Sequence, residues 1–248
     1  MLRMKVIGTG SSGNCYFLQD EETRAALLLD AGLKGKRIIR ALGSLAGIQG
    51  CLITHEHMDH AAGLVELAAL GVDVYATKGT LGALGATSNR IHEAELMKTI
   101  QTADFMIIPF ETQHDATEPC GFLIRHLRSG AVILYATDTY YVRYTFPGVH
   151  FWLVECNYVE EIVQDMERRG EMSGQLHRRL LTSHMSLRRL KDALAANDLT
   201  AARKIVLLHL SSERSDEARM VREVSDVSGV ETVAAVNGEE IELSLSPF

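Results

Sequence analysis

The chain has 248 residues and a formal net charge of −7, with 46% hydrophobic and 23% charged residues. These values are ordinary for a globular protein, and they exclude a disordered or collagen-like chain. The four cysteines are far apart and form no Cys-x-x-Cys pair, which excludes a disulfide scaffold and a cysteine-bound metal and indicates reduced thiols, as in the cytoplasm.

Short apolar runs that end abruptly in polar residues predict β-strands over 4–8, 15–19, 25–29, 50–54, 72–76, 105–109, 121–125, 131–136, 151–155, 204–208 and 232–236. Amphipathic patterns predict helices over 34–45, 62–70, 159–169, 186–197 and 215–227. Hairpin spacings mixed with helices favour a layered α/β domain. No apolar run approaches the roughly 18–20 residues of a membrane-spanning helix. We therefore expect a single cytoplasmic domain over residues 1–248.

A glycine-rich segment follows the first predicted strand. Gly8 to Gly13 match the pattern G-x-G-x-x-G, and Asp30 stands 17 residues beyond Gly13, close to where a dinucleotide-binding protein places its ribose-binding acid. That interpretation requires a helix to begin at the glycines, whereas residues 14–18 favour a strand. We expect a tight turn between two strands, and the backbone N–H groups of such a turn can face an anion.

The sharpest motif is the segment from Thr54 to His60, directly after an apolar strand. It holds His55, His57, Asp59 and His60, although the whole chain has only ten histidines. Imidazole and carboxylate groups are ligands of divalent metals such as zinc. A spacing of two places His55 and His57 on one face of an extended chain, and Asp59 with His60 forms a second cluster. This pattern predicts two metal ions side by side.

One loop cannot supply the four or so ligands that each ion needs, so other strand ends on the same edge are expected to contribute. Asp138, His209 and His114 each follow a predicted strand. A carboxylate has two oxygens, so Asp138 can bridge two ions. His92, His126, His150 and His177 have no such context and are expected to be structural or surface residues.

The order His-x-His-x-Asp-His, then a spaced His, Asp and His, resembles the metallo-β-lactamase superfamily over nearly the whole chain. The resemblance implies an α/β fold, an αββα sandwich of two mixed β-sheets flanked by helices, with the metals at one edge. The implied ligands are His55, His57 and His114 for the first ion, Asp59, His60 and His209 for the second, and Asp138 between them. Asp30 matches the first motif, and the resemblance implies that it supports the histidine loop from the second shell of the metal site.

Further motifs resemble the YycJ/WalJ-like subgroup, in segments 11–16, 33–36, 114–122, 155–158, 182–186 and 209–213. That resemblance implies a DNA exonuclease or a related phosphodiesterase. Fold alone names no substrate, so two alternatives stay open. One is a small-molecule ester hydrolase, such as a lactonase or a glyoxalase II-like thioesterase. The other is a metal-stabilised binding protein without activity, which the complete ligand set disfavours.

His184 precedes a predicted helix for which Ser186 is a plausible N-cap. It is either a capping or surface residue, or a functional group that contacts a phosphate oxygen or protonates the leaving group. Residues 166–191 carry seven Lys and Arg against two Glu, a local charge of +5. This stretch is either a binding surface for DNA, which we expect as the substrate, or a solvated pair of helices.

The expected mechanism uses two divalent ions. A hydroxide that bridges them attacks the phosphorus or carbonyl centre, Asp59 holds or accepts a proton of that water, and His184 assists the leaving group. We expect zinc, with manganese or iron as alternatives, because nitrogen and oxygen ligands accept all three.

Overall fold

The computed structural model describes residues 1–245 and contains two seven-stranded β-sheets. The first sheet consists, in spatial order, of β14 (Glu240–Leu243), β1 (Leu2–Gly8), β2 (Cys15–Asp20), β3 (Ala26–Leu29), β4 (Ile48–Leu52), β5 (Val74–Ala76) and β6 (Ile91–Glu93). Strands β14 to β3 pair antiparallel, and strands β3 to β6 pair parallel. This sheet is therefore mixed, and the final strand of the chain pairs with the first.

The second sheet consists, in spatial order, of β13 (Glu231–Ala234), β12 (Lys204–Leu208), β11 (Phe151–Glu155), β10 (Val132–Ala136), β9 (Cys120–His126), β8 (Phe105–Glu111) and β7 (Ile100–Gln101). Strands β10 to β13 pair parallel, whereas β9 is antiparallel to both β8 and β10. Strands β8, β10, β11 and β12 therefore all run in the same direction. Their carboxyl ends meet at one edge of the sheet.

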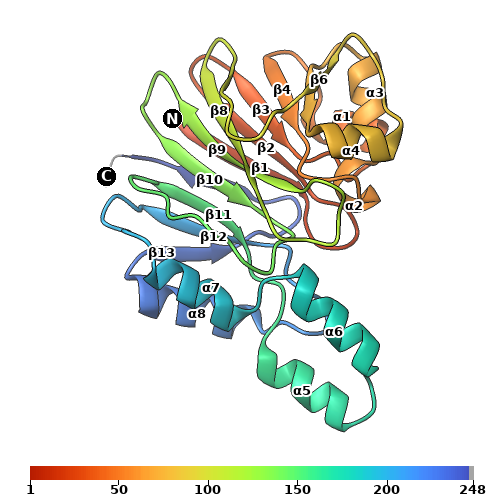
Figure 1. Ribbon diagram of the computed structural model, residues 1–248. Helices are drawn as coiled ribbons and strands as arrows, with labels where there is room; N and C mark the ends of the chain where they lie inside the picture. The colour runs from red at the N-terminus through yellow and green to blue at the C-terminus, as the bar shows by residue number, and fades with distance from the viewer. Residues whose placement is uncertain (246–248) are drawn as a thin grey trace.

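Helices cover the outer face of each sheet (Figure 1). The first sheet is covered by α1 (Gly35–Leu42), α3 (Leu64–Ala69) and α4 (Lys78–Leu84), and the second by α7 (Leu187–Ala195) and α8 (Glu217–Ser228). Two further helices, α5 (Glu160–Arg168) and α6 (Gly174–Ser183), project beyond the second sheet. The layers are helix, sheet, sheet, helix, which confirms the αββα architecture expected from the sequence. No helix within residues 1–245 has the length and apolar character that crossing a membrane requires.

Strand β3 shows how the sequence builds these layers. Leu27 and Leu29 are buried in the apolar core between the two sheets, whereas Leu28 is buried in the core beneath α1 and α3. Successive side chains of a strand point to opposite faces, so a strand covered on both sides is a continuous apolar run. This explains why 26–29 reads Ala-Leu-Leu-Leu. The same strand carries the chain to Asp30 at the edge of the sheet.

The structure adds elements that the sequence did not predict. Strands β6 and β7 have three and two residues, which is too short for a periodic signal, and β14 was also missed. Helix α4 contains two glycines, which lower helix propensity. Its N-terminus is instead held by the Thr77 side chain, which accepts from the Thr80 N–H, and by Glu118, which accepts from the Gly79 N–H at 2.6 Å.

Helix α6 was missed although the sequence contains a cap for it. The Ser173 side chain accepts a hydrogen bond from the Leu176 N–H at the start of the helix. The N-cap predicted for the following helix is confirmed, because the Ser186 side chain accepts from the Arg189 N–H. His184 lies between the two, at the C-terminal end of α6.

Candidate metal centre

The candidate site residues converge because the strands that carry them end at one edge. Asp30 follows β3 and the histidine motif follows β4, and these two strands are parallel neighbours. His114, Asp138 and His209 follow β8, β10 and β12, which run in one direction. A short helix, α2 (Met58–Ala61), begins inside the motif, with His57 as its extended N-terminal cap. The extended geometry expected for the motif therefore ends at His57.

Three site residues turn sharply where their strands end. Asp30, Asp138 and His209 have φ angles of 58°, 48° and 54°, in the left-handed region that side chains other than glycine rarely adopt. Such a conformation costs of order 1–3 kcal/mol and persists where the surrounding structure imposes it. Each of these side chains is buried at the junction between the two sheets. The turns aim them into one site.

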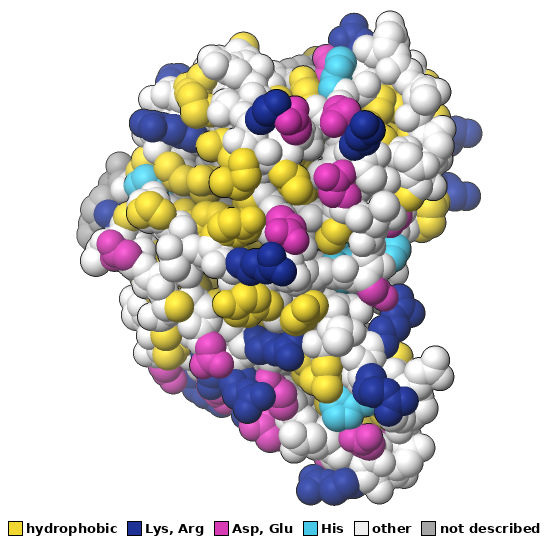
Figure 2. All heavy atoms as spheres, viewed as in Figure 1, with side chains coloured by type: hydrophobic (Ala, Val, Ile, Leu, Met, Phe, Trp, Pro, Cys, Tyr) yellow, Lys and Arg dark blue, Asp and Glu magenta, His cyan; other side chains and the backbone are white. Residues whose placement is uncertain are grey.

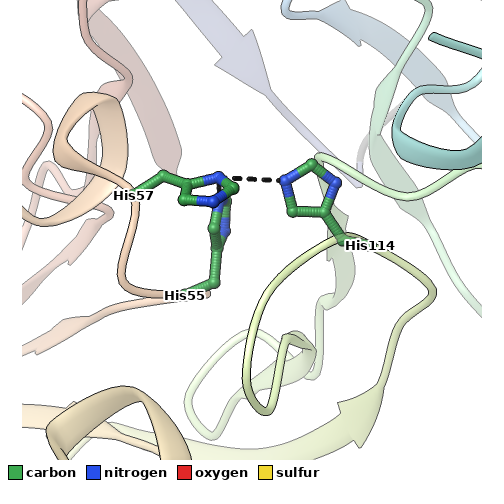
Figure 3. A group of neighbouring side chains, drawn as sticks. All are labelled: His55, His57 and His114. Carbon is green, nitrogen blue, oxygen red and sulfur yellow. Dashed lines mark hydrogen bonds between the residues drawn. The ribbon is translucent and has the colours of Figure 1, made fainter. Parts of the chain in front are cut away.

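The first group consists of His55, His57 and His114 (Figure 3). His57 Nδ1 lies 3.1 Å from His55 Nε2 and also 3.1 Å from His114 Nε2. In a tetrahedral zinc site with Zn–N distances of about 2.0–2.1 Å, neighbouring nitrogens are roughly 3.3 Å apart. Burial lowers the pKa of His55 and of His114, which favours the neutral imidazole that a metal binds. The donor set therefore fits one divalent ion.

The other ring nitrogen of each deeply buried histidine is held in place. His114 Nδ1–H donates to the Ser183 carbonyl at 2.8 Å, and His55 Nδ1 lies 3.0 Å from Thr54 Oγ1. Metal-binding histidines commonly have such partners, which fix the ring orientation and the tautomer. The Nε2 atoms of both rings are thereby directed into the site.

Asp138 lies between two groups of histidines. Its Oδ2 is 3.7 Å from His114 Nε2 and 4.0 Å from His55 Nε2. Its Oδ1 is 3.3 Å from His60 Nε2 and also contacts His209 Nδ1. The two oxygens of this carboxylate therefore face different donors. This is the arrangement that a bridging ligand requires.

Asp30 supports His60 from beneath the site. Its carboxylate is fully buried and accepts from His60 Nδ1 at 2.8 Å, from the Tyr135 hydroxyl at 2.6 Å and from the Thr54 N–H at 2.8 Å. A buried carboxylate is tolerated where donors satisfy it. Because Asp30 holds Nδ1 of His60, Nε2 of this ring faces the site. Nδ2 of Asn14, a residue that the sequence interpretation did not single out, lies 3.0 Å from that nitrogen.

The second predicted set is less compact than the first. His60 groups with His55 and Asp138, whereas His209 groups with Asp138, Glu155 and His184. Asp59 belongs to neither group; its Oδ2 is 3.7 Å from His60 Nε2, and its side chain is 28% exposed. Asp59 therefore stands at the rim of the cavity, close to His60.

Glu155 is the residue that sequence reasoning missed most clearly. It is fully buried at the end of β11, and its Oε1 accepts from His184 Nδ1 at 2.7 Å. Its Oε2 accepts from the backbone N–H of Thr139 at 3.0 Å and of Met185 at 3.2 Å. Burial disfavours the charged form of His184, but the Glu155 carboxylate outweighs it and raises the pKa of His184 to about 9. The sequence did contain a signal for a functional role of Glu155, because this acid directly ends the apolar run of strand β11.

Glu56, between two of the site histidines, joins the histidine loop to the His114 loop. Its Oε1 accepts from both the N–H and the hydroxyl of Thr117 at 2.7 Å. These bonds connect a loop of the first sheet to a loop of the second. They help to fix the separation of His57 and His114.

A cavity of about 310 Å³ opens over the site. Asp138, His209 and His184 lie in its floor and walls, and Leu176, Arg179 and Leu180 of α6 contribute to one wall. Arg214 and the tip of the glycine-rich turn, Ser11, also line it. Segments far apart in the sequence thus enclose one space that is lined by basic, acidic and apolar side chains.

The basic stretch 166–191 does not form a continuous positive surface. Five of its seven cationic residues contact carboxylates, namely Arg168, Arg169, Arg179, Arg188 and Lys191. In Figure 2, Lys and Arg side chains are interspersed with Asp and Glu across the face shown. The stretch is therefore mostly a set of paired surface charges, and Arg179, which lines the cavity, is itself paired with Asp115.

The remaining histidines lie outside the site. His92 pairs with Asp73 at 2.8 Å and His177 with Glu167 at 2.8 Å. His126 contacts the Ser129 hydroxyl at 2.8 Å, and His150 accepts from the Val132 N–H at 3.0 Å. Their contacts are structural or lie at the surface.

Comparison with known proteins connects this geometry to a family. A family model described as Beta-lactamase superfamily domain matches residues 26–210. The exodeoxyribonuclease WalJ of Streptococcus pneumoniae is 32% identical over 231 residues, which cover 86% of this chain and 83% of that protein. The exodeoxyribonuclease YycJ of Bacillus anthracis is 29% identical over 244 residues, which cover 91% of this chain and 89% of that protein.

A solved structure agrees with the fold. The metallo-beta-lactamase fold protein YhfI from Bacillus subtilis superposes with a TM-score of 0.72 at 16% identity, covering 98% of this chain and 100% of that chain. The resemblance drawn from the histidine motif and the strand-end ligands is thereby confirmed. The chain belongs to the beta-lactamase superfamily.

Proposed function

We propose that this protein is a phosphodiesterase that uses two divalent metal ions and acts on DNA as an exonuclease. The observation that carries the proposal is the position of Asp138, whose two oxygens face two different sets of histidines. Structural metal sites need only one closed coordination sphere, so a shared carboxylate favours a catalytic pair. The nuclease names of the two relatives support DNA as the substrate.

The proposed ligands are the two sets expected from the sequence. His55, His57 and His114, which form one group, hold the first ion. Asp59, His60 and His209 hold the second, with Asp138, which contacts both His60 and His209, shared between the two ions. Nitrogen and oxygen donors accept zinc, manganese or iron(II), and zinc is our first choice. Divalent ions bound there supply an activated water and neutralise charge on substrate oxygens.

The chain's own residues supply the proton for the leaving group. His184 lines the cavity, and its Nδ1–H is held by Glu155. Among residues 1–245 its other ring nitrogen has no hydrogen-bond partner, so it can donate to an oxygen that leaves the phosphorus. A general acid must lie within hydrogen-bonding reach of that oxygen and must carry the proton at working pH. The Glu155 carboxylate fixes the direction of the ring and favours its protonated form.

A second candidate is a hydrolase of small-molecule esters, such as a lactone or thioester. A cavity of about 310 Å³ has the size of a small-molecule site, and most cations of segment 166–191 are already paired. Both observations favour a compact substrate. A nucleic acid could still enter by one end, as an exonuclease requires.

One assay separates the two candidates. Purified protein loaded with Zn²⁺ or Mn²⁺ is offered labelled duplex and single-stranded DNA, a bis-aryl phosphodiester, a lactone and a thioester. The proposal predicts phosphodiester hydrolysis with mononucleotide release from DNA ends, and rates that fall steeply as salt rises. Turnover of the lactone or thioester alone would reject it in favour of the second candidate.

A further inference from the structure

Arg214 lies in the wall of the cavity with most of its charge unpaired. Its side chain is 22% exposed, and its Nε is buried without a hydrogen-bond partner among residues 1–245. Within that range, the one carboxylate that pairs with it is Glu213, 3.5 Å away on a side chain that is 68% exposed. A buried donor without an acceptor is unfavourable. This arrangement favours an incoming acceptor.

The other arginine of the cavity differs in this respect. Arg179 Nε lies 3.1 Å from Asp115 Oδ2, on a side chain that is 66% exposed. Its charge is therefore already compensated and largely solvated. Arg214 is the stronger candidate for binding an anion.

The glycine-rich turn brings further donors to the same cavity. The Thr9 hydroxyl accepts from the His209 N–H at 3.2 Å, which places the turn beside the loop after β12. Gly10 has a φ of +84°, which favours glycine, and it lies beside that loop, since a Cβ there would contact the Leu210 carbonyl at an ordinary 3.6 Å. Ser11 lines the cavity. Ser11 is exposed, and its backbone N–H donates to no backbone carbonyl among residues 1–245.

Ser211 adds another donor. It lines the cavity, and its Oγ accepts from the backbone N–H of Arg214 at 3.3 Å. Within the described chain its hydroxyl hydrogen has no acceptor. Guanidinium, hydroxyl and turn N–H groups together are the donors that recognise phosphate.

We propose that Ser11, Ser211 and Arg214 form a phosphate subsite beside the metal centre, which binds a second phosphate of the substrate. The inference rests on the proposed function and specifies its substrate class, a nucleotide chain with at least two phosphates. Asp138 and His209 line the same cavity of about 310 Å³. A phosphate held by Arg214 is therefore a neighbour of the one at the metals. It is either a terminal phosphate or the next diester of the chain.

The test compares thymidine nucleotides that differ in their second phosphate: TpT has none, pTpT and TpTp have a terminal one, and TpTpT has an internal one. The preference is the ratio of kcat/KM for each longer substrate to that for TpT. We expect Arg214→Ala to lower the preference by at least tenfold, which corresponds to about 1.4 kcal/mol. Arg214→Lys, which keeps the charge but loses the planar fork, is expected to give an intermediate loss.

Arg203→Ala is the matched control. Arg203 precedes β12, at the end of the strand opposite His209, and its guanidinium bonds only to the Thr200 and Ala202 carbonyls among the described residues. The Arg203→Ala substitution removes the same charge as Arg214→Ala and is expected to leave the substrate preference unchanged. If Arg214→Ala does not fold, as judged by circular dichroism, Arg214→Met retains the aliphatic stem and carries the same prediction.

The outcomes are distinct. A fall for pTpT or TpTp alone supports a subsite for a terminal phosphate, and a fall for TpTpT supports one for the internal diester. An unchanged preference for all three substrates overturns the subsite, including the case in which Arg214→Ala slows every substrate equally. Failure of the wild-type protein to hydrolyse TpT, pTpT, TpTp and TpTpT would instead reject the proposed function.

Discussion

Asp138 is the residue that connects the two halves of the candidate metal centre. We expect Asp138→Asn to lower phosphodiester turnover by at least about 100-fold, because an amide offers one neutral oxygen where two charged ones are needed. Asparagine tolerates a positive φ, so the turn after β10 is expected to survive. Turnover, metal content and melting temperature of the variant check this. Wild-type turnover with metal still bound would contradict the bridging role.

In the proposed mechanism Glu155 acts through His184, whose Nδ1 it contacts at 2.7 Å. We expect Glu155→Gln to lower kcat on DNA by about 10- to 100-fold with little change in KM, because it removes the carboxylate that orients and charges the imidazole. The loss of kcat is expected to be smaller for bis-(p-nitrophenyl) phosphate, because its p-nitrophenolate leaving group needs little protonation. Parallel assays on both substrates check this. Equal losses on both would show that Glu155 has only a structural role.

At the residue scale, much of the site could be predicted from the sequence. His55, His57 and His60 are close together in the chain. Asp138 and His209 follow strongly apolar strands. Residue type and position in the sequence are therefore enough to select these residues as candidates. Glu155 could not be assigned a role in this way, because its function depends on His184, 29 residues away, contacting it in space. The role proposed for Arg214 likewise could not be predicted from the sequence, because it depends on the position of this side chain in the wall of the cavity.

At the scale of elements, α5 and α6 form a unit with a small core of its own. Val163 and Met172 are buried there with Tyr158 and Leu180, apart from the core under α7 and α8. We expect Val163→Ala, which costs about 1–3 kcal/mol, to loosen this unit alone, since local regions can open independently. Amide exchange over 160–183 should accelerate about tenfold, with the melting temperature changed by less than about 2 °C.

Val224→Ala in α8 is the matched control for this prediction. Val224 is fully buried in the larger core. Its truncation is expected to lower the global melting temperature by several degrees, roughly 2–4 °C per kcal/mol. A comparable global loss from Val163→Ala would show that α5 and α6 are not a separate unit.

Helices α7 and α8 are joined by an ion network around Glu223. Hydrogen bonds from Arg219 and then Lys191 lower the pKa of Glu223 to about 2, from the usual 4.5. Because the pKa of Glu223 is lower in the folded state than in the unfolded chain, its ionised carboxylate stabilises the folded state at pH values above about 4.5. This contribution is lost as the pH falls from about 4.5 to 2. Because this side chain is 27% exposed, we expect solvent screening to leave about 1 kcal/mol.

Glu223→Gln should therefore make the free energy of unfolding less dependent on pH between about 4.5 and 2. Urea titrations across this range check the expectation. A variant with the same pH dependence as the wild-type protein would show that the network contributes nothing measurable.

Elements with strong periodicity were predictable, and those held by tertiary contacts were not. The strand 151–155 is a run of apolar residues that ends in one acid, and its bounds match the prediction. Helix α4 contains Gly79 and Gly82, and it depends on Glu118 from a distant loop. Strands β6 and β7 exist because their neighbours in the sheet offer hydrogen-bonding edges.

At the scale of the whole molecule, the metal centre lies where the two sheets meet. The histidine loop comes from the first sheet, whereas His114, Asp138 and His209 come from the second. Ions bound to both stabilise the folded state, since the unfolded chain lacks the site. We expect removal of metal by a chelator to lower the melting temperature by at least about 5 °C, and Zn²⁺ or Mn²⁺ to restore it.

The same treatment of Asp138→Asn provides a control for that prediction. Its response to chelator should be smaller, because the shared ligand is already weakened. A melting temperature that does not depend on metal in the wild-type protein would show that the two sheets are held together by their apolar core alone.

The central claim is that this edge of the sandwich binds a pair of divalent ions. Anomalous diffraction from crystals grown with Zn²⁺ or Mn²⁺ tests it most directly. We predict two peaks about 3.5–4 Å apart, one among His55, His57 and His114 and the other beside His60 and His209, with Asp138 contacting both. A single peak, or peaks elsewhere with no density at the histidine motif, would contradict the account.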